Sequence, residues 1–208
     1  MIPTDRKRYL LEHPIARNLT ENTPYGINLV GALQVSDKYV NNRKVCIIDS
    51  GYDNTHQDLP RNTVSGISIV KGISWNMADG SGHGTHVAGT IAAIGNNDKG
   101  VIGINRNNRI NLHLVRVFGE NGKWILGSDL VKAVEQCRDV GSNIVSMSLG
   151  GLDYSNFEFE AYKRIYEEDG VLLVAAAGNK GDNSYSYPAS YDPVISVAAI
   201  DSHNGTTR

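Results

Sequence analysis

The chain has 208 residues, of which 40% are hydrophobic and 20% are charged, and its formal net charge is −2. This length favours one domain with a sizeable core over two domains, and the charge offers no basic surface for nucleic acid. No apolar run reaches the roughly 18 residues that cross a bilayer, so we expect no membrane partner, and the first eleven residues do not form a secretory signal.

The N-terminal stretch of residues 1–22 is polar and charged, and it contains Pro3 and Pro14. This composition predicts an arm rather than a part of the core. The apolar character of the chain increases from Lys44 onward, where the predicted elements of the domain begin.

Short apolar runs then follow one another along the chain. They are Val45–Ile48, Ile110–Phe118, Ile144–Leu149, Val171–Ala177 and Val194–Ile200. Most are continuous rather than alternating, which is typical of strands covered on both faces. The residues between the runs predict helices at His83–Ile94, Asp129–Val140 and Phe157–Asp169.

The ends of these helices carry recognisable signals. Ser128 and Asn156 are the expected N-caps of the second and third helix, and Gly141 and Gly170 end them. Strands that alternate with helices predict a parallel sheet with crossover helices. In such a sheet, binding and catalytic sites form at the carboxyl ends of the strands.

The chain contains two cysteines, Cys46 in an apolar strand and Cys137 in an apolar-periodic helix. The simpler interpretation is two buried thiols. A disulfide stays open as the alternative, because a sequence does not give the distance between two residues.

Polar side chains stand at the ends of apolar elements. Asp49 follows a buried strand, His83 opens a helix and Asn179 follows another strand. Each residue alone is more often structural, as a cap, a satisfied core histidine or a turn former. An acid, an imidazole and an amide donor at one sheet edge are, however, three parts of an acyl-transfer site.

Several segments, in this order along the chain, resemble motifs of the subtilisin family of serine endopeptidases. They are VCIIDSG at 45–51, HGTHVAGT at 83–90, SMSLGG at 146–151 and AAAGN at 175–179. The order and spacing of the family pattern agree from about residue 23 to residue 201. We therefore identify the sequence as similar to this family.

The resemblance implies a three-layer, doubly wound α/β fold, with a mostly parallel sheet covered by helices on both faces and incomplete at the C-terminus. Residues 23–208 would form the N-terminal two thirds of the peptidase domain. Residues 1–22 resemble the tail of the family's inhibitory propeptide, so the chain's own propeptide is an expected partner.

The resemblance also implies roles for single residues. His83 would be the general base, Asp49 would orient it, and Asn179 would donate to the oxyanion. The residues expected to bind protein or peptide substrates are Ser148, Leu149, Gly150, Ala176, Ala177, Gly178 and Trp124. Trp124 lies at the end of an expected edge strand at 119–124.

Structural calcium is a further implication of the resemblance. Asp58 matches a calcium ligand of the family, and Asn96 offers an amide oxygen from the facing loop. The loop at 95–100 is one residue longer than in familiar members, which leaves the exact ligands open. The resemblance further implies a secreted monomer.

The family's nucleophilic serine lies in a G-T-S-M-A segment, and the 208 residues contain none. We therefore expect a piece of a longer precursor that is inactive and poorly stable by itself. A catalytically inactive, peptide-binding relative is the alternative. A metal hydrolase using Asp49, His83 and His86 is a weaker one, because we expect His86 to point into the small-residue packing of its helix.

Overall fold

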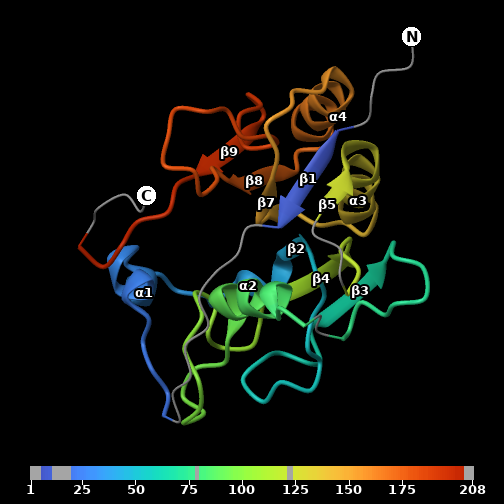
Figure 1. Ribbon diagram of the computed structural model, residues 1–208. Helices are drawn as coiled ribbons and strands as arrows, with labels where there is room; N and C mark the ends of the chain where they lie inside the picture. The colour runs from blue at the N-terminus through green and yellow to red at the C-terminus, as the bar shows by residue number, and fades with distance from the viewer. Residues whose placement is uncertain (1–5, 11–19, 78–79, 121–123, 204–208) are drawn as a thin grey trace.

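The computed structural model describes residues 6–10, 20–77, 80–120 and 124–203. Its centre is a six-stranded sheet in which every neighbouring pair is parallel (Figure 1). The strands, in their order across the sheet, are β3 (Val64–Ser68), β4 (Asn111–Arg116), β2 (Lys44–Asp49), β6 (Ile144–Met147), β8 (Leu172–Ala176) and β9 (Val194–Val197). The expected parallel sheet is therefore confirmed.

Helices cover both faces of this sheet. Strand β2 shows why, because its side chains alternate between two separate cores. Val45 and Ile47 pack with residues of α2 (His83–Ala92) on one face. Cys46 and Ile48 pack with residues of α3 (Gly127–Asp139) and α4 (Asn156–Glu167) on the other. The three-layer α/β architecture that the resemblance implies is thus confirmed.

The helix boundaries differ from the expected ones by a few residues. Helix α3 begins at Gly127, and no side chain caps it, so Ser128 is not its N-cap. Helix α4 begins at Asn156, and the hydroxyl of Ser155 accepts the cap hydrogen bond from the backbone N–H of Glu158 at 3.4 Å. Within residues 20–43, three short helical turns precede β2, namely α1 (Tyr25–Leu29), η1 (Ala32–Gln34) and η2 (Val40–Asn42).

A second, three-stranded antiparallel sheet contains the N-terminal arm. Strand β1 (Lys7–Leu10) lies between β5 (Trp124–Leu126) and β7 (Leu149–Gly150), as Figure 1 shows. In this register Tyr9 pairs with Trp124 on one side and with Gly150 on the other. The expectation that the arm stays outside the core is wrong here, because the side chain of Arg8 is completely buried.

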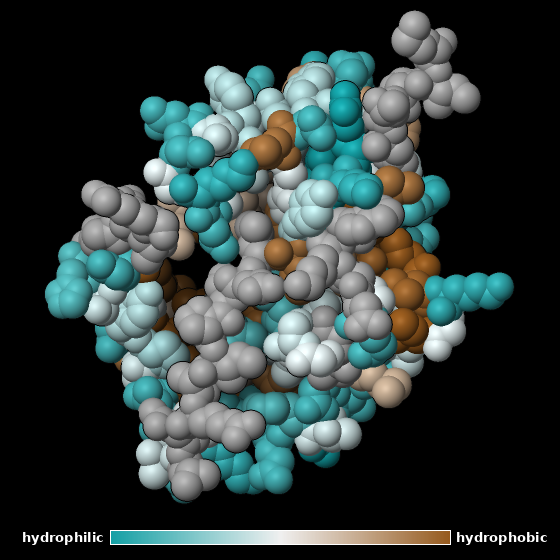
Figure 2. All heavy atoms as spheres, in the orientation of Figure 1, coloured by the Kyte–Doolittle hydropathy of each residue, from teal (hydrophilic) through white to brown (hydrophobic). Residues whose placement is uncertain are grey.

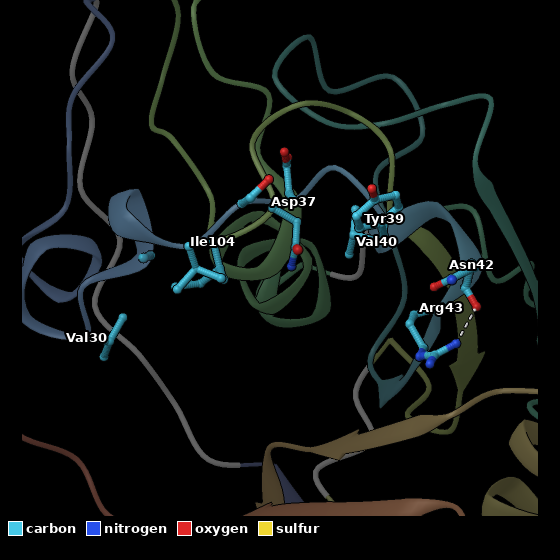
Figure 3. Close-up of a pocket in the computed structure, with 11 residues that line it drawn as sticks. Val30, Asp37, Tyr39, Val40, Asn42, Arg43 and Ile104 are labelled. Carbon is cyan, nitrogen blue, oxygen red and sulfur yellow. Dashed lines mark hydrogen bonds between the residues drawn. The ribbon is translucent and has the colours of Figure 1, made fainter.

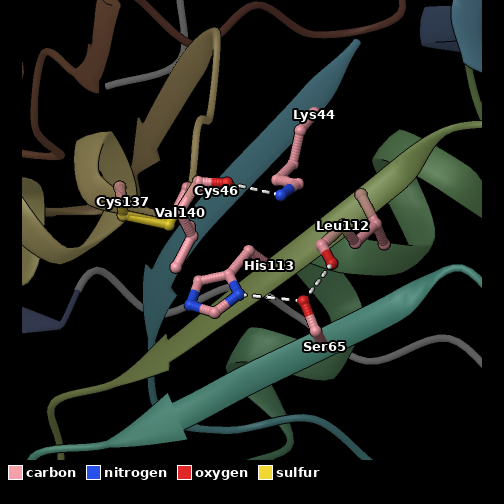
Figure 4. Close-up of a disulfide and its surroundings, with 7 residues drawn as sticks. All are labelled: Lys44, Cys46, Ser65, Leu112, His113, Cys137 and Val140. Carbon is pink, nitrogen blue, oxygen red and sulfur yellow. Dashed lines mark hydrogen bonds between the residues drawn. A yellow bond between two sulfur atoms is a disulfide. The ribbon is translucent and has the colours of Figure 1, made fainter. Parts of the chain in front are cut away.

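The two cysteines form a disulfide between β2 and α3, with a Cα–Cα distance of 5.6 Å between Cys46 and Cys137 (Figure 4). The simpler expectation of two buried thiols is therefore wrong. The bond joins residues 91 positions apart, and it ties the middle of the sheet to the helix that covers it.

Hydrophilic residues cover most of the face seen in Figure 2, and a hydrophobic area lies on the side where β3 runs. At the other edge of the sheet, β9 leaves Ile195 and Val197 about half exposed. None of the described helices combines the length and the apolar character that a membrane crossing needs.

Candidate active site

The carboxyl ends of β2, β6 and β8 form one edge of the parallel sheet. Ile48 is in register with Met147, and Met147 with Ala175, so these strands end side by side. Asp49 is the last residue of β2, and its side chain is buried. An acid at this place needs polar partners, because a buried carboxylate without them is costly.

The partner of this carboxylate is the imidazole of His83, the first residue of α2. The Nδ1 atom of His83 lies 2.8 Å from Oδ1 of Asp49, and both side chains are almost completely buried. The backbone N–H of Ser50 donates to the same oxygen at 2.7 Å. Because a carboxylate oxygen accepts hydrogen bonds, this contact assigns the imidazole proton to Nδ1 and the basic lone pair to Nε2.

Glycine allows helix α2 to approach the end of β2 this closely. A Cβ on Gly84 would lie 2.2 Å from the backbone oxygen of Gly51 and 3.0 Å from Oδ1 of Asp49. The hydroxyl of Ser50 accepts a hydrogen bond from the N–H of Gly84 at 3.1 Å, which fixes the first turn of the helix. The glycine after the histidine is thus a packing requirement of the contact.

Arg116 is a part of this site that sequence reasoning missed. It ends β4 in register with Asp49, and its side chain is completely buried. Its guanidinium donates to the backbone oxygens of Phe118 at 3.1 Å and Met77 at 2.9 Å. Arg116 therefore holds the loop that passes next to Gly51, and only its place at a strand end could have signalled this role.

The neighbouring histidine has a different environment. His86 is exposed, so the expectation that it points into the packing of α2 is wrong. Within the described ranges, no group of three or more His, Cys, Asp and Glu side chains is arranged to hold a metal ion.

Asn179 lies at the same sheet edge, beyond β8. It is exposed and lines a pocket of about 720 Å³ together with Gly150, Ala177 and Gly178. Strand β8 is two places from β2 in the sheet, a separation of roughly 10 Å between strand axes. The structure thus brings Asp49 and His83 into contact and places Asn179 on a pocket at the end of β8, two strands away along the same edge.

Three of the expected substrate-binding residues, Gly150, Ala177 and Gly178, line this pocket. Leu149 and Gly150 form β7, which already pairs with β1, and Ser148 is half-buried just before it. Ala176 ends β8, ahead of the pocket-lining Ala177. The side chain of Trp124 lies outside the described part of the structure, as do residues 121–123 of the expected edge strand.

The two expected calcium ligands, Asp58 and Asn96, have different surroundings. The carboxylate of Asp58 is buried and accepts hydrogen bonds from Nδ2 of Asn97 at 2.8 Å and from the N–H of Val101 at 2.9 Å. Asn96 is exposed, and among the described residues no hydrogen bond joins it to Asp58. Both oxygens of Asp58 thus accept hydrogen bonds from the loop, and the amide that contacts Asp58 belongs to Asn97 and not to the expected Asn96.

A second pocket, of about 520 Å³, lies elsewhere in the molecule between η1, η2 and residues 104–105 (Figure 3). Asp37 and Arg43 are its charged lining residues. It contains none of the residues of the sheet edge, so it contributes nothing to the Asp49–His83 site.

Comparison with known proteins agrees with this geometry. The model of the subtilase family of peptidases matches residues 41–208. The chain belongs to the subtilase family. This subtilase is 41% identical over 189 residues to subtilisin DY from Bacillus licheniformis, covering 88% of this chain and 66% of the relative. It is 37% identical over 209 residues to subtilisin amylosacchariticus from Bacillus subtilis subsp. amylosacchariticus, covering 94% and 51%.

A solved structure shares the fold of this subtilase. It is the psychrophilic subtilisin-like protease from the Antarctic psychrotroph Pseudoalteromonas sp. AS-11, with a TM-score of 0.82 and 51% sequence identity. The alignment covers 89% of this chain and 42% of that protein. The subtilase chain thus spans between about two fifths and two thirds of the length of these relatives.

Proposed function

We propose that this subtilase is a serine endopeptidase whose acid and base are Asp49 and His83, with the nucleophilic serine supplied by sequence outside these 208 residues. The observation that carries the proposal is the 2.8 Å contact between His83 Nδ1 and Asp49 Oδ1 at the edge of the sheet. It supports the proposal because it fixes the tautomer that a general base needs.

Each residue would have a definite part in the reaction. His83 Nε2 would take the proton of the serine hydroxyl as it attacks the peptide carbonyl, and it would return that proton to the leaving amine. Asp49 would stabilise the imidazolium that forms between these steps. Asn179 would donate to the oxyanion, where the loss of one donor costs about a hundredfold to a thousandfold in rate.

The substrate class that we propose is an extended segment of a protein or peptide. Backbone groups of β7 and of the strand opposite it would bind the segment as an added strand, with Ser148, Leu149 and Gly150 on one side. The pocket bounded by Ala176, Ala177 and Gly178 would take one side chain, and Trp124 would face another. The small lining residues leave room for a large apolar group.

Residues 1–22 would act as the tail of an inhibitory propeptide. Support comes from β1, which occupies the place between β5 and β7 where a substrate strand would have to lie. The arm would therefore compete with a substrate for the groove between β5 and β7.

We further propose structural calcium held by Asp58 and oxygens of the loop at 95–101, and a secreted, monomeric protein. The Cys46–Cys137 disulfide supports an oxidising compartment, since such bonds are rare in the cytosol. Calcium would supply charge neutralisation for the buried Asp58 carboxylate and would rigidify the loop.

The reading frame downstream of Arg208 tests the function. An in-frame G-T-S-M-A segment, together with hydrolysis of a fluorogenic peptide by the product and blockage by a serine-directed inhibitor, is the expected result. The 208-residue chain should show no turnover in the same assay. Turnover by this chain that a serine-directed inhibitor blocks would contradict the proposed division of the triad.

A catalytically inactive peptide-binding protein is the second candidate. The three-stranded sheet favours it, because binding of β1 between β5 and β7 uses no serine. A stop codon directly after Arg208, with retained binding of extended peptides, would support this candidate over the enzyme.

A further inference from the structure

The strand that occupies the groove buries a charged side chain. In β1 the side chains of Lys7 and Tyr9 are exposed and Leu10 is half-buried, whereas Arg8 is completely buried. A strand held by backbone pairing alone would have no reason to bury a guanidinium, since an unpaired buried charge is very costly. The groove must therefore contain a partner for this group.

The partner is Glu158, in the first turn of α4. A guanidinium nitrogen of Arg8 donates to Oε2 of Glu158, and both side chains are completely buried. Another hydrogen bond runs from the same nitrogen to the backbone oxygen of Asp153 at 3.1 Å. The acceptors come from residues far beyond the arm, so they belong to the wall of the groove.

Two glycines make room for this pair. A Cβ on Gly127 would lie 2.9 Å from the carboxyl carbon of Glu158. A Cβ on Gly151 would lie 2.4 Å from the backbone oxygen of Lys7 and 3.1 Å from a guanidinium nitrogen of Arg8. Any other residue at these positions would fill the space that the arginine and the glutamate now occupy.

The carboxylate of Glu158 is also held from behind. The hydroxyl of Tyr191 donates to Oε2 of Glu158 at 2.9 Å, and the backbone N–H of Ser155 donates to that hydroxyl at 3.0 Å. Burial, followed by the negative charge of Glu158, raises the pKa of the Tyr191 hydroxyl, so it remains a donor at neutral pH. The carboxylate is therefore held by Tyr191 as well as by the guanidinium.

We infer that Glu158, with Gly127 and Gly151, forms an arginine-selective pocket of the substrate groove, and that this subtilase prefers extended peptides with arginine at the position that Arg8 occupies. The inference rests on the proposed function, because it names the substrate class of the same groove. Arg8 of the arm is the first occupant of the pocket. Its position is two residues before the one that pairs with Leu149.

Glu158 is a specificity-determining residue in this account. A peptide with leucine at the position of Arg8 would leave the Glu158 carboxylate buried without a cation. This cost is the main reason why such a site binds arginine more tightly than leucine. The guanidinium of Arg8 uses two nitrogens, one for Glu158 and the Asp153 oxygen and the other for the backbone oxygen of Lys7 at 3.0 Å. A lysine has a single nitrogen for all of these acceptors, so arginine is favoured over lysine as well.

Peptide binding to the 208-residue chain tests the pocket without any need for the serine. In a chain carrying Arg8→Glu, the arm presents a second carboxylate to Glu158 and should leave the groove. A fluorescein-labelled peptide with the sequence of residues 5–12 is then titrated against the same peptide with leucine in place of its arginine 8, by fluorescence anisotropy. Arg6→Glu is the matched control, because Arg6 is partly exposed and its arm should stay in place.

The arginine peptide should bind the Arg8→Glu chain at least about thirtyfold more tightly than the leucine peptide. Addition of Glu158→Gln should reduce this ratio at least about tenfold. Equal affinity for the two peptides, or a ratio that survives Glu158→Gln, would overturn the inference. So would an Arg8→Glu arm that remains bound and excludes both peptides.

A second measurement covers the case in which Arg8→Glu prevents folding. In the otherwise unchanged chain, Glu158→Gln should speed hydrogen exchange at the Tyr9 amide at least about tenfold, with the Leu112 amide of β4 unchanged. Unchanged exchange at Tyr9 would contradict the pocket. The longer protein encoded beyond Arg208 separates the two proposals. If it hydrolyses no peptide but the selectivity for arginine persists, the proposed peptidase activity is wrong and the arginine-selective pocket is supported.

Discussion

The imidazole of His83 and the carboxylate of Asp49 meet at 2.8 Å although 34 positions separate them in the chain. The contact depends on how closely the first turn of α2 approaches the end of β2. Gly84 sets that distance, because a Cβ at this position would lie 2.2 Å from the backbone oxygen of Gly51.

Gly84→Ala should therefore separate Asp49 from His83 and destabilise the chain. The added methyl group would lie 2.2 Å from a backbone oxygen, which cannot move aside as a flexible side chain can. We expect a loss of about 3 kcal/mol in the free energy of unfolding, measured by urea denaturation. Gly26→Ala is the control, since a Cβ there meets nothing within 4 Å; an equal effect of both substitutions would show that the close approach does not matter.

The layered fold follows from local patterns. Continuous apolar runs predict five of the central strands, although β9 leaves Ile195 and Val197 about half exposed. Strand β3 escaped prediction, since its Ser65, Gly66 and Ser68 interrupt the pattern and it pairs with β4 alone within the described sheet. Residues that lie at the edge of a sheet need less apolar surface, so the signal weakens there.

The Cys46–Cys137 disulfide should contribute strongly to stability. A bond that closes a loop of 91 positions reduces the entropy of the unfolded chain, in a model that gives about 4.6 kcal/mol for such a loop. Reduction should lower the melting temperature by roughly 10 °C, measured by calorimetry. A Cys46→Ala/Cys137→Ala chain should not respond to the reductant, and an unchanged melting temperature of the reduced wild type would contradict the prediction.

His113 should make folding sensitive to acid. It is buried beside the disulfide, with Nδ1 2.9 Å from the hydroxyl of Ser65 (Figure 4). Burial, and then the charge of Lys44, lower the pKa of His113 below its ordinary value of 6.5. The folded state thus favours the neutral ring, so its stability is complete above about pH 6.5 and falls as the pH drops toward the folded-state pKa.

Urea midpoints between about pH 5 and pH 8 measure this dependence. His113→Gln should flatten the curve below about pH 6.5, because the titrating group is gone. The exposed His203 provides the control, and His203→Gln should keep the wild-type curve. A curve that His113→Gln leaves unchanged would assign the acid sensitivity to another group.

Calcium should stabilise the chain through Asp58. Excess calcium should raise the melting temperature by several degrees, since a ligand that binds only the folded state adds to its stability. Asp58→Asn should remove the calcium-dependent part of the shift. Asp53→Asn changes a nearby carboxylate that bonds to Thr55, and it should keep the shift. Equal melting temperatures with calcium and with a chelator would contradict the site.

Contacts between residues far apart in the chain could not be predicted from the sequence. Asp49, His83 and Asn179 were all marked by their places at the ends of apolar elements. The partner of Arg8 lies 150 positions away and that of Cys46 lies 91 positions away, and neither distance has a local signal. The sequence therefore predicts a solvated arm, although the side chain of Arg8 is buried.

The most direct test uses the longer protein that is encoded when the reading frame continues beyond Arg208. Its kcat/KM on a fluorogenic peptide is compared with that of its Asp49→Asn variant. The account predicts a fall of about ten-thousandfold, because the amide of asparagine would stabilise the wrong tautomer of His83. The matched Asp53→Asn variant should stay close to wild type. Full activity of the Asp49→Asn protein would contradict the assignment of Asp49 and His83 as the acid and base of a peptidase.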